Sequence, residues 1–225
     1  MQKDKKPKTS VRLKIKGDFA CFTRPEMKGE RVSYDAITPS AARGIIEAIH
    51  WKPEIRWIID RIHVINPIRF CNIRRNELRS AVSRRLVKVA MKNNRRPVAR
   101  FIENDRVQRA SMILRDVAYV IEAHYKLTNH RAKKDALKHR EIFNRRVSRG
   151  QCFHQPYFGC REFSAEFKPV NGESLVKSSI TGSLDLGLML HDLDYANGVR
   201  PTFFHAQMVD GIIDVPPLKV KEVIK

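Results

Sequence analysis

The order in which strand and helix patterns follow one another over the first 150 residues constrains the fold most. Apolar residues alternate with basic ones over residues 11–16, which is typical of a half-buried strand. Gly17 is expected to break that strand, with a continuation after a bend. Thr38-Pro39 then predicts the start of a helix, because Thr caps helix N-termini and Pro suits the first helical position. Pro53 predicts its end.

Two further strand patterns and one helix pattern follow. An Ile-rich strand is expected over residues 55–68, and residues 112–127 favour a second, although their first half could be helical. Residues 135–149 have the period of a helix, and a basic insertion at about 69–110 is expected to be a hairpin or loop with short elements. Strand, helix, strand, strand and helix in this order predict a ferredoxin-like domain, the RRM-like scaffold of RNA-recognition modules.

The composition changes after Gly150. Aromatic residues, glycines and short alternating runs replace the long periodic stretches. We therefore predict an α+β protein with two domains. Residues 1–150 would form the ferredoxin-like domain, and residues 151–225 would form a small antiparallel β-sheet unit.

The basic insertion is the chain's strongest electrostatic feature. Residues 74–115 hold thirteen Arg and Lys against three acids, a net charge of +10 within a total of +20. Eleven of the thirteen are Arg, whose planar guanidinium matches phosphate oxygens and stacks on bases. Interleaved apolar residues argue against a purely solvated face or disordered arm. We expect RNA contacts from these arginines: Arg74, Arg75, Arg84, Arg85, Arg95, Arg96, Arg145, Arg146 and Arg149.

Other compositional signals limit the function. No apolar run approaches the ~20 residues that span a bilayer, and the first ten residues lack the apolar stretch of a signal peptide, so a cytoplasmic protein without membrane contact is expected. Cys152, His154 and Cys160 could ligate a metal, but no CxxC pair is present, which favours reduced thiols. No metal or cofactor is predicted.

Candidate catalytic residues occur in two places: His50 at the end of the first expected helix, and Lys138-His139 on the second. RNA cleavage without a metal needs a base for the 2′-hydroxyl, an acid for the leaving 5′-oxygen and a cation for the phosphorane. Histidine can act as acid or base near neutral pH, and lysine supplies positive charge. A helix that only contacts phosphate would also explain Lys138-His139, and the helix dipole alone would also favour a cationic His50.

Three segments carry a resemblance to a known family: GDFACFT, RVSYDAITPSAARGIIEAIHWKPEIRWIIDRIHVINPI and PYFGCREFSAEF. In this order, over nearly the full length, they resemble the CRISPR-associated Cas-five family, variant d (Cas5d), of subtype I-C systems. The resemblance implies a ferredoxin-like N-terminal domain and a small C-terminal β-sheet. It also implies a metal-independent endoribonuclease that cuts CRISPR repeat RNA near the base of its hairpin.

The same resemblance implies roles for single residues. The family's catalytic Lys-His pair falls on Lys138 and His139. Its third catalytic residue, a Tyr before Trp-Lys-Pro, is replaced here by His50. An imidazole can accept a proton at neutral pH, whereas a phenol with a pKa near ~10 mostly donates or positions. His50 and His139 could therefore work as a two-histidine acid–base pair.

Two alternatives remain at this stage. A binding-only subunit would cap the 5′ handle of the guide RNA while another nuclease cuts, and a basic ribosomal-type protein would explain the charge alone. The resemblance implies repeat RNA and the other subunits of a type I-C surveillance complex as partners. The basic groove would also tolerate double-stranded DNA, with steep salt dependence.

Overall fold

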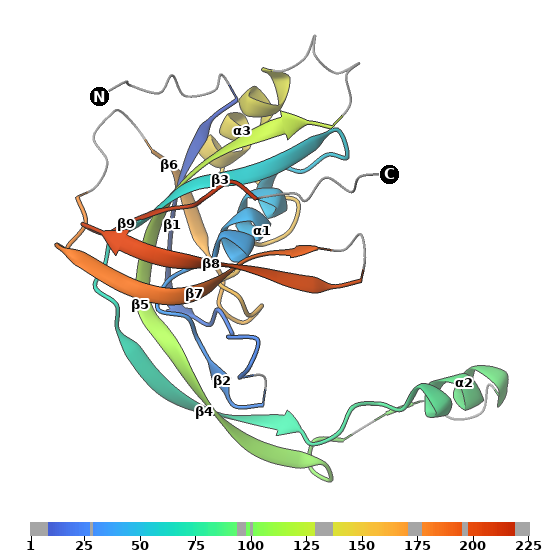
Figure 1. Cartoon of the computed structure of the whole chain (residues 1–225). Helices are drawn as coiled ribbons and strands as arrows, with labels where there is room; N and C mark the ends of the chain where they lie inside the picture. Colours follow the sequence, from blue (N-terminus) through green and yellow to red (C-terminus); the bar gives the residue numbers. More distant parts are fainter. Residues whose placement is uncertain are drawn as a thin grey trace, which may run out of the picture.

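The fold is mixed α/β, and its described part contains one large, mainly antiparallel sheet and three helices (Figure 1). The computed structural model describes residues 9–27, 29–93, 98–99, 101–128, 137–170, 177–194 and 198–218. The strands are β1 (Val11–Ala20), β2 (Arg31–Val32), β3 (Ile55–Val64), β4 (Phe70–Leu78), β5 (Arg106–Leu127), β6 (Glu166–Pro169), β7 (Ser183–Asp194), β8 (Arg200–Val209) and β9 (Ile212–Asp214). The helices are α1 (Pro39–Ile49), α2 (Arg84–Asn93) and α3 (Lys138–Ser148).

The sheet is organised around β5, which is 22 residues long. The strand order is β6-β1-β5-β3-β9-β8-β7, and β2 and β4 pair with the first half of β5. The pairs along that path are antiparallel, and β2 runs parallel to β5. The second half of β5 is almost continuously buried because β1 and β3 flank it. Its first half is also strand, so the helical alternative for this region is wrong.

Gly17 does not break β1. It stays in the ladder opposite Val117, and the strand continues to Ala20. A Cβ at this position would lie 2.7 Å from the ring of Phe158, closer than side chains tolerate. The glycine therefore permits the close approach of the 158–164 segment, and the prediction of a break was wrong.

Helix α1 forms as its sequence predicts. The Thr38 hydroxyl accepts a hydrogen bond from the Ala41 amide at 3.2 Å, and Pro39 is the first helical residue. Its apolar stripe, which includes Ile45 and Ile49, is buried against the sheet, and α1 also contacts α3. Helix α3 buries one face, which carries His139, Phe143 and Val147.

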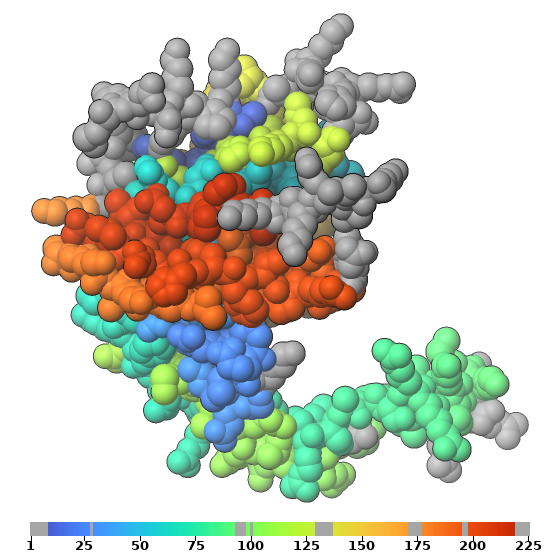
Figure 2. Space-filling view, viewed as in Figure 1, coloured from blue at the N-terminus to red at the C-terminus, as the bar shows by residue number. Residues whose placement is uncertain are grey.

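The basic insertion forms a hairpin that leaves the body of the molecule, as expected. Strand β4 pairs with the first half of β5, and α2 lies beyond the end of β4 (Figure 1). Figure 2 shows this arm extending away from the C-terminal strands, with open space between them. The side chains of α2 are mostly exposed, including Leu86 and Met91.

The C-terminal strands join the same sheet. β6 pairs with β1 at one edge, and β9 pairs with β3 on the other side. Strands from beyond residue 150 therefore flank the strands from before it. The described cysteines are all reduced. Among the described residues, no helix is both long and apolar enough to cross a bilayer.

Candidate active site

His50 is held by the end of α1 and by the strand that follows it. Its backbone amide donates to the Ile46 carbonyl at 3.0 Å as the C-cap of the helix. Its carbonyl accepts a hydrogen bond of 2.8 Å from the indole Nε1 of Trp57 on β3. These two hydrogen bonds hold the His50 backbone at its amide and at its carbonyl, and His50 is only 1% exposed.

His139 lies in the first turn of α3 and is 3% exposed. Its ring meets the ring of Tyr125 edge to face, with centroids 5.8 Å apart. The Tyr125 hydroxyl accepts from the backbone amide of Arg140 at 3.2 Å, which ties the start of α3 to β5. The Nε2 of His139 lies 3.3 Å from a carboxylate oxygen of Glu54, which is half exposed.

The structure brings His50 and His139 into direct contact. His50 Nε2 lies 3.2 Å from His139 Nδ1, and the rings stack at 29° with centroids 5.4 Å apart. Arg146 strengthens the junction of the two helices, because its guanidinium donates to the Ile49 carbonyl at 2.6 Å. The contacts therefore run from Glu54 through His139 to His50.

The environment keeps His50 neutral at physiological pH. Burial lowers the pKa of His50 to about 4, and the positive charges of Arg146 and Lys52 act in the same direction. Its Nδ1 is buried and has no hydrogen-bond partner within the described part of the chain. A carboxylate only accepts, so Glu54 requires a proton on His139 Nε2. Neutral His139 then accepts from His50 at Nδ1, and the direction of that bond reverses when His139 gains a second proton.

Lys138 is the first residue of α3 and is exposed, directly beside the buried His139 in sequence. It lies where the positive end of the helix dipole adds to its own charge. The structure therefore places a cation and a histidine at the same helix end. Among the described residues, no group of three or more His, Cys, Asp or Glu side chains could hold a metal ion.

The arginines predicted to bind RNA fall into different environments. Arg74, Arg84, Arg85, Arg145 and Arg149 are exposed. Arg75 is partly buried, pairs with Glu162 and contacts Ser111, and Arg146 contacts the Ile49 carbonyl, so both have internal partners. Arg95 and Arg96 lie outside the described residues.

Sequence reasoning did not identify Glu54 and Tyr125 as parts of this site. Glu54 follows the Trp-Lys-Pro segment four residues after His50, a signal that could have marked it as a partner for a nearby histidine. Tyr125 gave no such signal, because aromatic residues are common in buried strands.

The fold and site define a basic protein with one large sheet and a buried histidine pair where two helices meet. A family model described as "CRISPR-associated protein (Cas_Cas5)", of the Cas5d type, matches residues 10–216. The chain therefore belongs to the Cas5d family of CRISPR-associated proteins.

Two relatives agree with this assignment, and one solved structure agrees with the fold. A protein of Mannheimia succiniciproducens named CRISPR pre-crRNA endoribonuclease Cas5d is 53% identical over 221 residues, covering 95% of this chain and 97% of the relative. The protein of the same name from Thermus thermophilus is 40% identical over 236 residues, covering 96% of each. A crystal structure described as a CRISPR-associated protein superposes with a TM-score of 0.65 at 24% identity, covering 92% of both chains, and supports the fold.

Proposed function

We propose that this protein is an endoribonuclease that cuts CRISPR repeat RNA near the base of its hairpin. The contact between His50 and His139, beside Lys138, carries the proposal, because it brings together an acid–base group, a second imidazole that orients it, and a cation. The name of the relatives, CRISPR pre-crRNA endoribonuclease, supports the substrate.

The proposed reaction needs no metal. A base takes the proton of the 2′-hydroxyl, O2′ attacks the adjacent phosphorus, and an acid returns a proton to the leaving 5′-oxygen. The products are a 2′,3′-cyclic phosphate and a 5′-hydroxyl, so atoms and charge balance. Lys138 stabilises the charge that builds on the phosphorane oxygens.

The two histidines have different parts in this proposal. His139 touches the RNA, since its Nε2 faces the half-exposed Glu54, and His50 supports it from behind through the 3.2 Å contact. Neutral His50 accepts from the His139 imidazolium and donates to neutral His139, so it orients the ring in both protonation states. The RNA has to take the place of Glu54 beside the Nε2 of His139. The negative charge of a bound phosphate repels the Glu54 carboxylate, which favours its movement away from His139.

The proposal extends to the arm and to the partners. The exposed arginines of the arm would hold the RNA backbone, and after cleavage the protein would stay on the 5′ handle within a type I-C surveillance complex in the cytoplasm. The same basic surface would also accept double-stranded DNA, with an affinity that falls steeply with salt.

We also propose that the part of the fold that carries the site is a ferredoxin-like domain. The order β1-α1-β3-β5-α3-β6, with the sheet order β6-β1-β5-β3, supports a ferredoxin-like arrangement for the part that carries the site. We place the domain boundary near residue 150, with the C-terminal unit lending β6 to this sheet.

A binding-only subunit that caps the 5′ handle is the second candidate. The observation in its favour is the burial of the histidine pair, at 1% and 3% exposure. Incubating purified protein with repeat RNA in EDTA, beside an RNA that cannot form the hairpin, separates the two. The endoribonuclease cuts only the hairpin RNA, whereas a cap binds the RNA and leaves it intact.

A further inference from the structure

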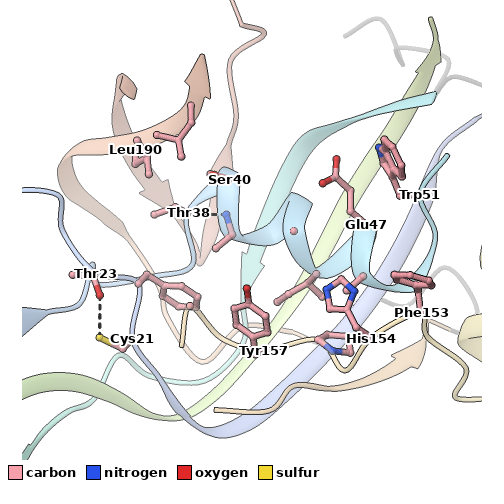
Figure 3. Close-up of a pocket in the computed structure, with 18 residues that line it drawn as sticks. Cys21, Thr23, Thr38, Ser40, Glu47, Trp51, Phe153, His154, Tyr157 and Leu190 are labelled. Atoms are coloured by element: carbon pink, nitrogen blue, oxygen red, sulfur yellow. Dashed lines mark hydrogen bonds between the residues drawn. The ribbon is translucent and has the colours of Figure 1, made fainter. Parts of the chain in front are cut away.

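A groove of about 690 Å³ lies on the outer side of α1 (Figure 3). One wall is α1 itself, including Ser40 and Glu47, and the facing wall is the segment from Phe153 to Tyr157, with β7 closing one end. Its volume is in the range of ~300–1,000 Å³ that is usual for ligand sites. We call it the aromatic groove.

Two large aromatic side chains in this groove are exposed. Trp51 is 52% exposed and Phe153 is 84% exposed, although rings of this size are normally covered. The Phe153 amide donates to the Ala48 carbonyl at 2.8 Å, which ties this segment to α1, and Trp51 directly follows the α1 C-cap. Figure 3 shows the two rings at the same end of the groove. These two exposed rings are large enough to stack on a planar ligand.

The polar groups of the groove suit a nucleobase better than a phosphate. Within the described residues its lining has no Lys or Arg, so it offers little to a phosphate group. It does offer hydroxyls from Thr23 and Tyr157 and the carboxyl of Glu47, which can bind the edge of a base. Burial raises the pKa of Glu47, with Arg43 acting against it, and the ionised carboxylate can accept hydrogen bonds from the amino groups of a base.

The groove is next to the proposed reaction centre. Trp51 lines it and is the residue after His50, whose ring contacts His139. Lys138, the proposed phosphate-binding residue, is the first residue of α3 and directly precedes His139. Consecutive residues, His50 and Trp51, therefore belong to the histidine pair and to the groove wall.

We propose that the aromatic groove binds an unpaired nucleobase of the repeat RNA beside the scissile phosphate, by stacking on Trp51 and Phe153. This inference rests on the proposed function and adds a base-binding site to it. Stacking tolerates any base, because every base has a π face, while the hydroxyls and Glu47 favour particular edges. The groove then sets which nucleotide enters the reaction centre.

The test uses a repeat RNA with a 2′-deoxy nucleotide at the scissile position, so that binding is measured without cleavage. Each unpaired nucleotide beside the hairpin is replaced in turn by an abasic one. We expect one abasic replacement to weaken binding to the wild-type protein about tenfold, the usual scale of one stacked base. The same replacement should have no further effect on the Trp51→Ala, Phe153→Ala protein.

Fluorescence gives a second readout. The chain has two tryptophans, and Trp57 is buried at 1% exposure, so RNA that stacks in the groove should quench Trp51. The quenching should vanish in Trp51→Phe and persist in Phe203→Ala, a control that removes an exposed phenylalanine outside the groove.

The outcomes separate the two proposals. If an abasic replacement weakens binding equally in the wild-type and double-variant proteins, the proposed base-binding site is wrong. Unchanged RNA affinity of the double variant would also overturn it. If the double variant still cuts all-ribose repeat RNA normally in that case, the proposed endoribonuclease function stands. Wild-type protein that neither binds nor cuts repeat RNA contradicts both.

Discussion

The Nε2 of His50 and the Nδ1 of His139 lie 3.2 Å apart, although 89 positions separate the two residues in the chain. The contact exists because α1 ends where α3 begins, with Arg146 bonded to the last carbonyl of α1. It makes each histidine's protonation depend on the other and gives the proposed site its chemistry.

His139→Ala should lower single-turnover cleavage of repeat RNA by about 10²- to 10⁴-fold with little change in RNA affinity, as expected for an acid–base group. His50→Ala should give a smaller but clear loss, because His50 acts through His139. His205→Ala removes an exposed histidine on β8 and is the matched control. Full activity of the Lys138→Ala, His139→Ala double variant would refute the catalytic assignment.

His50→Tyr should retain activity, since a tyrosine stands at this position in the family pattern. Its hydroxyl can still hydrogen-bond to His139 Nδ1, whereas His50→Phe removes that bond and keeps the ring. Cleavage rates of the two variants, measured side by side, test whether the reaction requires a hydrogen bond from residue 50 to His139. Equal rates would mean that the bond has no role in the reaction.

Stability should fall as the pH is lowered from about 6.5 to about 4, and His50 should account for much of this. The pKa of His50 is about 4 in the fold and ~6.5 in the unfolded chain, so the unfolded state binds more protons in this window. The resulting loss in the free energy of unfolding is absent above about pH 6.5 and reaches about 3 kcal/mol near pH 4. Urea unfolding across this range should show a shallower pH dependence for His50→Asn than for wild type. The same slope in both proteins would contradict the burial of a neutral His50.

Replacing Arg84, Arg85, Arg95 and Arg96 by Ala should weaken RNA binding and flatten its salt dependence. Each lost phosphate contact lowers the slope of log K against log salt by roughly 0.7 to 0.9. Arg61→Ala, which removes a surface arginine paired with Asp214 on the sheet, should leave the slope unchanged. An unchanged slope in the arm variant would mean that the arm faces solvent or a protein partner.

Gly17→Ala should destabilise the protein by about 1–3 kcal/mol, because the added methyl group would overlap the Phe158 ring. Gly44→Ala is the matched control, since a Cβ there meets nothing within 4 Å and an alanine in a helix is favoured by up to ~1 kcal/mol. Thermal unfolding of the two variants checks the difference, and equal stability would exclude the close packing at Gly17.

Local patterns predicted the elements better than their connections. Thr38, Pro39 and Pro53 marked both ends of α1, because capping and proline sterics act within a few residues. The full length of β5 and the pairing of β9 with β3 depend on distant strands, so no local pattern contained them. Gly17 was misread because its role is to admit Phe158, 141 positions later in the chain.

The residues of the candidate site could be proposed from the sequence, but their geometry could not. His50, Lys138 and His139 were identifiable from their chemistry and the family resemblance. The direct contact of the two rings, and the lowered pKa of His50 that follows from burial, required the packing of α1 on α3. Glu54 was missed because its partner is 85 positions away.

The most direct test of the central claim is cleavage of repeat RNA in EDTA, with and without a single 2′-deoxy nucleotide at the scissile position. Attack by the 2′-hydroxyl predicts that the all-ribose RNA is cut and that the deoxy RNA is bound with the same affinity but stays intact. Cleavage of the deoxy RNA at the same position would contradict the proposed mechanism.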